Sequence, residues 1–480
     1  MGYHDIVIID DGVDESYIGM SVLRYNLEVG PDLRITERSD MCERHLSHGT
    51  ICAAIIAHYA PDASLGSIKV LDSRLHQGTR GQLEAALKWC LEQKPMLVSL
   101  SIGTIQSKDF DEIRPVLSEL YRKGFVLVAA YNNHFRYTVP ASLECVVGVR
   151  RKFFTEGRYG VNGDGFEIFA EACSVHELML RGRGRYHTPS SNSYAAPYVT
   201  ALLYNSLPGD FSGDIACLWE MLGQEREKPF CFFPDFLDSA VVAGSNEDEW
   251  PELFYFKAVT AELAAGPGKT GEGIYLVVLE KSASLMRSIL SETAVRQEYI
   301  KGIFCCWEEA GIGKGNLGGL GSRIWQEGYY IEKYRKYTSP GELEIPVVYF
   351  YGERRLLIGM LQALKGRFLE EGYNAKAVGQ FRRAYLYGLE YIDIVQNRET
   401  ILYNVYKRFD CDIILCGIAS REVIHDVEDV CFWMWEDMPG DENVSYIPVR
   451  ESAGDWTAKE IFRRIMALFD TDDDNRELGF

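Results

Sequence analysis

The sequence predicts an α/β protein built from two parallel-sheet domains, and three observations support this. Short apolar runs alternate with amphipathic helical patterns over residues 1–208. A second alternating series begins near residue 261, after a stretch rich in aromatic and acidic residues. The chain has 480 residues, more than one hydrophobic core usually supports. We therefore predict domains at residues 1–208 and 261–480, joined by a connecting segment at residues 209–260.

The first domain contains strand and helix patterns in regular alternation. Apolar runs predict buried strands at residues 6–9, 65–71, 96–100, 125–130 and 145–149. Apolar residues recur at steps of three and four in residues 81–92 and 111–123, which predicts amphipathic helices. Continuous apolar strands separated by such helices indicate a parallel sheet with helices on both faces. Functional side chains in such sheets gather at the carboxyl ends of the strands.

The second domain repeats this alternation with a degenerate nucleotide-fold pattern. Strands are predicted at residues 274–279, 303–306, 345–351, 413–416 and 444–449, and helices at 356–371 and 457–469. The acidic tail, residues 470–480, is expected to be frayed. Two glycine-rich segments, residues 266–270 and 311–318, partly match phosphate-binding loops but lack the full motif. Nucleotide binding therefore stays open beside the simpler interpretation of flexible surface loops.

Charge and composition exclude several classes of function. The net charge is −20, and residues 209–480 hold 46 Asp and Glu against 29 Lys and Arg. Such an acidic half argues against nucleic-acid binding, whereas a basic protein partner or a solvated surface both remain open.

No apolar run is long enough to span a membrane. The first ten residues suggest a strand and no signal peptide, and the 12 scattered cysteines suggest reduced thiols. We therefore expect a cytoplasmic protein with no membrane contact, no metal and no cofactor.

Three segment ends supply the chemical groups of a hydrolytic triad. Asp10 ends the first predicted strand, His48 lies in the first turn of a predicted helix, and Ser193 opens another helix. Acyl-bond hydrolysis needs a nucleophilic hydroxyl, a base that takes its proton and an acid that orients the base. These three residues supply one of each. Taken singly, each residue could instead have an ordinary structural role. Ser and His are common at helix starts, and Asp is common in turns after strands.

The motifs around these residues resemble the signature blocks of subtilisin-like serine peptidases. The blocks IIDDG, HGT and SNSYAAP occur in the order Asp, His, Ser. Two further blocks, LVSLSIG at 97–103 and VLVAAYN at 126–132, resemble the substrate-binding strand and the strand that ends in the oxyanion Asn. The resemblance covers residues 1–205 and implies a subtilisin-like parallel sheet, followed here by a second α/β Rossmann-like domain.

The resemblance implies a role for each matching residue. Ser193 corresponds to the nucleophile, His48 to the general base and then acid, and Asp10 to the group that orients the imidazole. Asn132 and the backbone N–H of Ser193 correspond to the oxyanion donors, with spacing favouring Asn132 over Asn133. The implied substrate-binding residues lie on two segments: Ser101, Ile102, Gly103, Ala129, Ala130 and Tyr131.

Two departures from the family pattern bear on specificity. Tyr131 stands where the family usually has Gly, so its phenol is expected to fill or reshape the pocket for the residue before the scissile bond. Ser191 and Asn192 stand where Gly and Thr are usual. The Tyr131 change argues against broad cleavage after large residues, so we expect narrow specificity or restraint by the second domain.

The sequence therefore predicts a serine endopeptidase of narrow specificity acting through a Ser193 acyl-enzyme. The whole chain also resembles, less specifically, the peptidases and companion proteins of clostridial peptide-maturation systems. That resemblance implies leader removal from a ribosomally made precursor peptide, with maturation proteins as partners. An alternative is a catalytically inactive docking platform for such a partner. The oligomeric state stays open.

Overall fold

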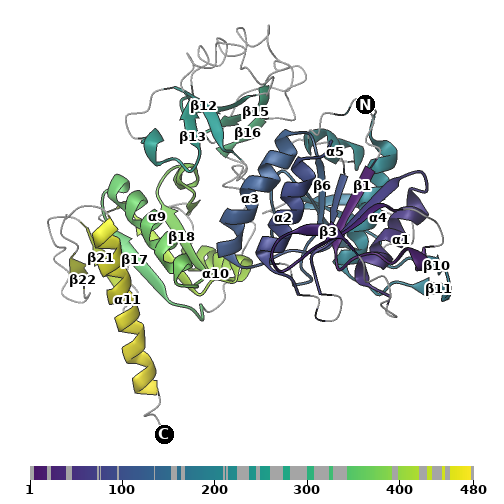
Figure 1. The fold of residues 1–480 in the computed structure, drawn as a ribbon. Coiled ribbons are helices and arrows are strands. Elements are labelled where there is room, and N and C mark those ends of the chain that lie inside the picture. The colour runs from purple at the N-terminus through teal and green to yellow at the C-terminus, as the bar shows by residue number, and fades with distance from the viewer. Residues whose placement is uncertain are drawn as a thin grey trace.

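The fold was analysed in a computed structural model of the full chain (Figure 1). The structure describes residues 5–18, 23–38, 46–72, 75, 77–94, 97–134, 136–152, 159–163, 168–208, 211, 215–223, 237–244, 249–259, 274–281, 300–307, 324–327, 343–391, 398–420, 430–434, 446–448 and 455–476. The two glycine-rich segments with partial phosphate-loop patterns, residues 266–270 and 311–318, lie outside this part of the chain.

The amino-terminal half forms a nine-stranded sheet in the order β3-β2-β4-β1-β5-β6-β7-β9-β8. Its strands are β1 Asp5–Asp10, β2 Leu23–Val29, β3 Ile35–Glu37, β4 Ser64–Lys69, β5 Leu97–Leu100, β6 Val126–Ala130, β7 Val147–Arg151, β8 Tyr159–Gly163 and β9 Ile168–Ala172. Only the edge strands β3 and β8 run antiparallel to their neighbours. The predicted parallel sheet is therefore confirmed, with β1 in its interior between β4 and β5.

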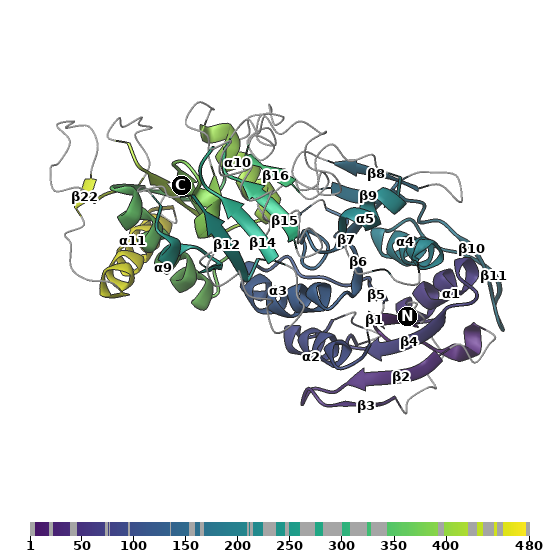
Figure 2. The same cartoon turned by 90° about the horizontal axis from the view of Figure 1, so that it is seen from above.

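Helices cover both faces of this sheet (Figure 2). They are α1 His48–Tyr59, α2 Arg80–Leu91, α3 Ser107–Arg122, α4 Asn192–Ser206 and α5 Ile215–Met221. Helices α1 and α4 pack together on one face, and α2 and α3 pack together on the other. Because β5 and β6 are buried along their whole length, their sequences are continuously apolar or small, as the sequence pattern required. A hairpin of β10 Glu177–Leu180 and β11 Gly184–His187 precedes α4.

The second half contains two parallel sheets. The first has the order β13-β12-β14-β15-β16, with β12 Ser239–Ala243, β13 Lys257–Val259, β14 Ile274–Val278, β15 Ile300–Cys305 and β16 Ile324–Gln326. Numbered along the chain, this order is 2-1-3-4-5, a doubly wound arrangement. Strands β12 and β13 fall within residues 209–260, so the segment expected to be a connector contributes two strands to this sheet.

The second of these sheets has the order β19-β18-β20-β17-β21-β22. Its strands are β17 Val347–Tyr351, β18 Ala375–Gln380, β19 Glu390–Tyr391, β20 Ile413–Ile418, β21 Val430–Trp433 and β22 Tyr446–Pro448. Numbered along the chain, the order is 3-2-4-1-5-6, which differs from the 3-2-1-4-5-6 order of a Rossmann fold. The helices are α9 Arg354–Glu370, α10 Arg398–Phe409 and α11 Asp455–Arg476.

Helix α11 corrects the expectation for the acidic tail. It continues through residues 470–476, beyond the predicted end at residue 469, and extends away from the rest of the molecule (Figure 1). It packs on α9, where the Phe462 and Phe368 ring centroids are 4.8 Å apart. This packing on its apolar face supports the helix, and its acidic residues follow without interrupting the hydrogen-bonded backbone.

A buried arginine joins the two sheets of the second half. Arg383 donates to the carbonyl oxygens of Leu279 at 2.6 Å and Cys306 at 3.1 Å, just past the carboxyl ends of β14 and β15. It also pairs with the buried Glu249 at 3.2 Å. Ligands of doubly wound sheets bind at this edge. Here protein groups from the neighbouring sheet occupy part of it.

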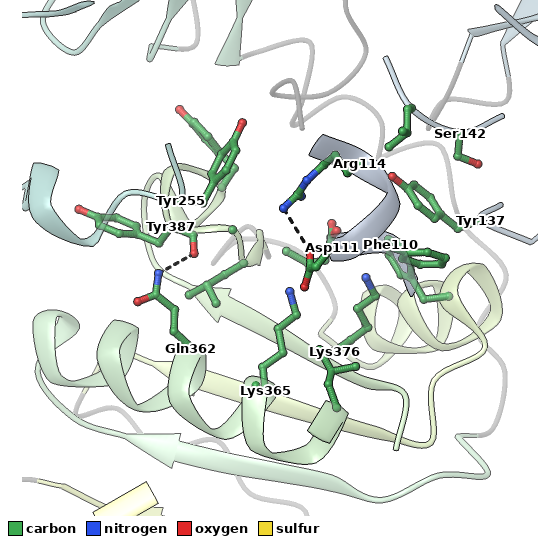
Figure 3. Close-up of a pocket in the computed structure, with 18 of the residues that line it drawn as sticks. Phe110, Asp111, Arg114, Tyr137, Ser142, Tyr255, Gln362, Lys365, Lys376 and Tyr387 are labelled. Atoms are coloured by element: carbon green, nitrogen blue, oxygen red, sulfur yellow. Dashed lines mark hydrogen bonds and ion pairs between the residues drawn. The ribbon is translucent and has the colours of Figure 1, made fainter. Parts of the chain in front are cut away.

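The two halves of the chain meet around α3 and α9 (Figure 3). A cavity of about 450 Å³ lies between them, with Phe110 and Arg114 of α3 on one side and Lys365 of α9 and Lys376 of β18 on the other. An ion pair between Arg122 and Asp238 adds a further contact. Among the described residues, no helix is both long enough and apolar enough to cross a membrane.

Candidate active site

Asp10 is held at the carboxyl end of the interior strand β1. Asp10 pairs with Lys69 at the end of β4. On the other side, the preceding residue Ile9 pairs with Leu100 of β5. The side chain is 1% exposed. A carboxylate this deeply buried needs partners that compensate the loss of water. One partner is the backbone N–H of Asp11, which donates to Asp10 Oδ1 at 2.8 Å.

His48 is the first residue of α1 because the preceding residue caps the helix. Ser47 accepts the backbone N–H of Thr50 at 3.2 Å and donates its hydroxyl to the carbonyl of Gly12 at 2.7 Å. The Asp11 carboxylate accepts the backbone N–H groups of His48 at 3.0 Å and Gly49 at 2.7 Å. This negative charge at the positive end of the helix fixes where α1 begins.

The two adjacent aspartates therefore differ in their contacts. Asp11 binds backbone N–H groups, while Asp10 faces the imidazole: His48 Nδ1 lies 2.9 Å from Asp10 Oδ2 and 3.0 Å from Oδ1. The structure thus brings together the predicted base and its orienting acid, and Asp10 is the closer match to that role. Burial raises the pKa of the Asp11 carboxyl, and the Asp10 charge raises it further.

Electrostatics favour the charged form of His48. Burial lowers the pKa of this imidazole, but the Asp10 carboxylate and the Cys52 sulfur outweigh it, so the pKa lies well above its usual range. The side chain is 19% exposed, against 1% for Asp10. One edge of the ring therefore remains open toward solvent, as a base that meets a substrate requires.

Cys52 is a neighbour of Asp10 and His48 that the sequence analysis missed. It lies one helical turn after His48, and its sulfur is 3.8 Å from His48 Nδ1 and 3.9 Å from Asp10 Oδ2. Burial raises the pKa of its thiol. The three side chains offer metal-ligand atoms within 4.8 Å of one another. However, Nδ1 and the carboxylate are already bonded to each other. The i, i+4 spacing on α1 was the available signal.

Ser193 lies in the first turn of α4, beside these groups. Its carbonyl accepts a hydrogen bond from Ser101 Oγ at 2.9 Å and lies 3.6 Å from the Cys52 sulfur. The ring of the next residue, Tyr194, lies 5.0 Å from the His48 ring, measured between centroids. Ser193 is partly exposed. These contacts place the Ser193 backbone beside Cys52, the neighbour of His48 and Asp10, while the residue remains partly exposed.

The backbone N–H of Ser193 has a partner in this structure. Ser191 is the N-cap of α4, and its hydroxyl accepts this N–H at 3.3 Å. The sequence analysis expected the same N–H to help bind the oxyanion. A bond of this length is weak, so an oxyanion could replace the Ser191 hydroxyl as acceptor.

Asn132 is oriented by the loop that follows it. Its Oδ1 accepts the backbone N–H groups of His134 at 3.0 Å and Arg136 at 3.1 Å. Because these two donors hold the oxygen, the Nδ2 end of the amide remains to donate elsewhere. Asn133 is held in a similar way, since its Oδ1 accepts the backbone N–H of Asn192 at 3.2 Å. The prediction of Asn132 as the amide donor therefore continues to rest on the sequence spacing.

Asn192 ties the start of α4 to this loop. Its Nδ2 donates to the carbonyl oxygens of Tyr131 at 3.1 Å and Asn132 at 2.8 Å, and its Oδ1 accepts the backbone N–H of Arg151 at 2.8 Å. The side chain is buried. The sequence analysis noted this residue as a departure from the family pattern but assigned it no role. A polar residue among buried neighbours was the signal that it bridges backbone groups.

The segment after β5 is open to an extended substrate. Ser101 and Ile102 are half-buried and Gly103 is exposed. Thr104 forms an antiparallel bridge with Val139, which fixes the far end of this segment. A side chain at Gly103 would meet Thr138 at 2.8 Å, so the backbone can run here only without one.

The other predicted pocket residues are less accessible. Ala129 is 0% exposed, Ala130 5% and Tyr131 3%. The Tyr131 ring lies over Gly148 and beneath the Arg150 guanidinium, 4.5 Å from the ring centroid. We expected this phenol on a pocket wall. Its burial is unfavourable to that role, because a ring lining an open pocket would expose part of its surface.

Comparisons with known proteins agree with this geometry. Residues 5–205 match the model of the Subtilase family. The subtilisin-like protease het-Q2 of Podospora anserina is 28% identical over 172 residues, covering 32% of this chain. This chain thus spans about half of that relative's length, at 47%.

Solved structures with a similar fold include three peptidases. A cold-adapted subtilisin-like serine proteinase is 19% identical with a TM-score of 0.35, covering 45% of this chain and 79% of its own. The prenylagaramide maturation protease PagA is 18% identical with a TM-score of 0.34, covering 46% and 94%. A lanthipeptide protease is 15% identical with a TM-score of 0.31, covering 42% and 71%. Residues 5–205 therefore resemble the subtilase family, whose model matches this part of the chain.

Proposed function

We propose that this protein is a serine endopeptidase that forms an acyl-enzyme through Ser193. The observation that carries the proposal is the contact between His48 Nδ1 and the Asp10 carboxylate, 2.9 Å apart, beside the first turn of α4. This contact leaves Nε2 as the ring nitrogen that can accept the Ser193 proton. The reaction needs no cofactor.

The proposed steps follow from these positions. His48 takes the hydroxyl proton as Ser193 attacks the substrate carbonyl, and Asp10 stabilises the imidazolium that forms. Asn132 Nδ2 donates to the developing oxyanion. His48 then gives the proton to the leaving amine, and water attacks the acyl-enzyme in the second half of the reaction.

The substrate is proposed to be an extended peptide of restricted sequence. It would pair with the backbone of Ser101, Ile102 and Gly103 as an added strand. Ser101 and Ile102 are half-buried and Gly103 is exposed, which supports the pairing of this segment with an extended backbone. Together with the family resemblance of the sequence, this favours leader removal from a ribosomally made precursor peptide.

The compartment is proposed to be the cytoplasm. All ten cysteines in the described part of the chain are free thiols, and nine of them are buried. Free thiols in this number suit a reducing environment, because oxidising compartments favour disulfides.

Active-site labelling tests the proposal. A fluorophosphonate probe should modify the wild-type protein and should leave Ser193→Ala unlabelled. Equal labelling of both proteins, or of neither, would support the docking-platform alternative. Incubation with peptides encoded beside the gene, followed by mass spectrometry, then tests leader removal separately from hydrolysis itself.

A further inference from the structure

The loop that follows Asn132 contacts the second half of the chain. We call residues 132–134 and 136–139 the Asn132 loop. Its Tyr137 donates its backbone N–H to the carbonyl oxygen of Arg408, in the last turn of α10, at 2.8 Å. Arg136 forms an ion pair with Asp410, directly after α10. The loop is therefore fixed from outside the subtilase domain.

Aromatic packing strengthens this attachment. The Tyr137 ring lies between Phe110 of α3, 5.3 Å away, and Phe409 of α10, 5.1 Å away, measured between centroids. The Lys376 ammonium lies 3.8 Å from the Phe409 ring centroid. Figure 3 shows Tyr137 and Phe110 on one wall of the cavity between the halves, with Lys376 opposite. The Tyr137 ring thus belongs to the contact surface of both halves.

The same loop holds the Asn132 side chain. The backbone N–H of Arg136 donates to Asn132 Oδ1 at 3.1 Å, so the residue paired with Asp410 also orients the amide. The side chain of Thr138 accepts the backbone N–H of Asn132 at 3.4 Å. Arg136 and the adjacent Tyr137 therefore connect the Asn132 amide to α10: Arg136 bonds to the amide oxygen and Tyr137 bonds to the carbonyl oxygen of Arg408.

We propose that the end of α10, residues 408–410, positions the Asn132 amide through Arg136 and Tyr137, and that hydrolysis depends on this contact. The second half of the chain is then part of the catalytic apparatus as a positioning element. This inference rests on the proposed function. Oxyanion donors act through preorganised geometry, and a displacement of about 1 Å can cost roughly 100-fold in rate.

Phe409→Ala tests the proposal, with Phe462→Ala as a matched control. Both rings are similarly buried, 6% and 9% exposed, and both lie in the second half, but only Phe409 contacts the Asn132 loop. With p-nitrophenyl butyrate as the probe, Phe409→Ala should lower kcat at least tenfold with KM within about twofold. Phe462→Ala should leave both constants near the wild-type values. Equal kcat in the two variants would overturn the proposal.

A milder pair guards against misfolding of Phe409→Ala. Asp410 has a positive φ of 51°, which Asn also tolerates, so Asp410→Asn removes the charge without backbone strain. Its control is Glu460→Gln, since Glu460 of α11 pairs with Arg464 of the same helix. The Asp410→Asn effect should be smaller, about two- to fivefold in kcat, because the ion pair is exposed. If Phe409→Ala misfolds, the test rests on Asp410→Asn. A kcat of Asp410→Asn equal to that of Glu460→Gln would then count against the proposal.

A double-mutant cycle with Asn132→Ala decides whether the effect passes through the amide. If it does, Phe409→Ala should cost little more in the Asn132→Ala background than Asn132→Ala alone. Fully additive losses would overturn the positioning role while leaving the peptidase proposal intact. Absence of hydrolysis in the wild type, or equal hydrolysis by Ser193→Ala, would instead overturn the proposed function.

Discussion

Asn192 donates its side-chain N–H to the carbonyl oxygen of Asn132 at 2.8 Å. This bond joins the helix that carries Ser193 to the loop that carries the predicted oxyanion donor. Ser193 and Asn132 are both expected to act on the substrate carbonyl. The buried Asn192 side chain therefore helps to set the distance between them.

Asn192→Ala should reduce both stability and activity. The substitution leaves the carbonyls of Tyr131 and Asn132 and the N–H of Arg151 without this partner. We expect the free energy of unfolding to fall by about 2–3 kcal/mol. With the loop and α4 no longer held together, kcat should fall roughly ten- to hundredfold. Denaturant unfolding and ester hydrolysis measure the two effects.

Asn133→Ala is the control for that substitution. Its exposed side chain contributes one hydrogen bond to the start of α4, at 3.2 Å. We expect less than about 1 kcal/mol of destabilisation and kcat close to the wild-type value. If both variants behaved alike, the bridging role of Asn192 would be wrong.

His48→Ala should remove the general base while leaving substrate binding nearly intact. The ring contacts Asp10 and Tyr194, and α1 is capped by Ser47 and Asp11, so the fold should survive the change. We expect kcat to fall by about 10³–10⁶-fold with KM changed little. His58→Ala, at the other end of α1, serves as the control. A kcat for His48→Ala near that of the control would contradict the triad.

The pH dependence of kcat/KM should reflect the raised pKa of His48. The base must be neutral to accept a proton, so activity rises as pH passes the imidazole pKa. Because Asp10 holds this pKa well above 6.5, the midpoint of the acidic limb should lie above pH 6.5. Asp10→Asn should move that midpoint to lower pH and lower kcat by about 10⁴-fold. An unchanged midpoint would show that Asp10 does not control the base.

Sequence patterns point to the proposed triad because each of its members lies at one end of a strand or helix. Asp10 terminates a buried strand and His48 and Ser193 lie in first helical turns, positions that the short-range pattern reveals. The five strands predicted for the first domain agree with β1, β4, β5, β6 and β7 to within two residues at each end. These strands have continuous apolar runs, so the sequence pattern indicates their positions clearly.

Other features depend on contacts between distant residues. The attachment of Arg136 to Asp410 and the orientation of the Tyr131 ring over Gly148 arise only when separate elements pack together. Strand β18, sequence AKAVGQ, escaped prediction because Lys376 and Gly379 interrupt its apolar pattern. The course of α11 past residue 469 follows from its packing on α9 rather than from its acidic sequence.

Lys376→Met should stabilise the protein at neutral pH. Burial and the nearby Lys365 lower the pKa of Lys376 to about 8, from its ordinary value of 10.5. The unfolded chain therefore keeps this proton at pH values where the folded chain has lost it. The free energy of unfolding should therefore rise between about pH 8 and 10.5. Below pH 8, the full cost of burying the charged ammonium should be present. Lys376→Met should gain about 1–3 kcal/mol at pH 7 and lose this advantage toward pH 10. Lys459→Met, at an exposed position of α11, should match the wild type at every pH in denaturant unfolding. Equal stability of the wild type and Lys376→Met at pH 7 would mean that the aromatic rings around the ammonium offset its burial completely.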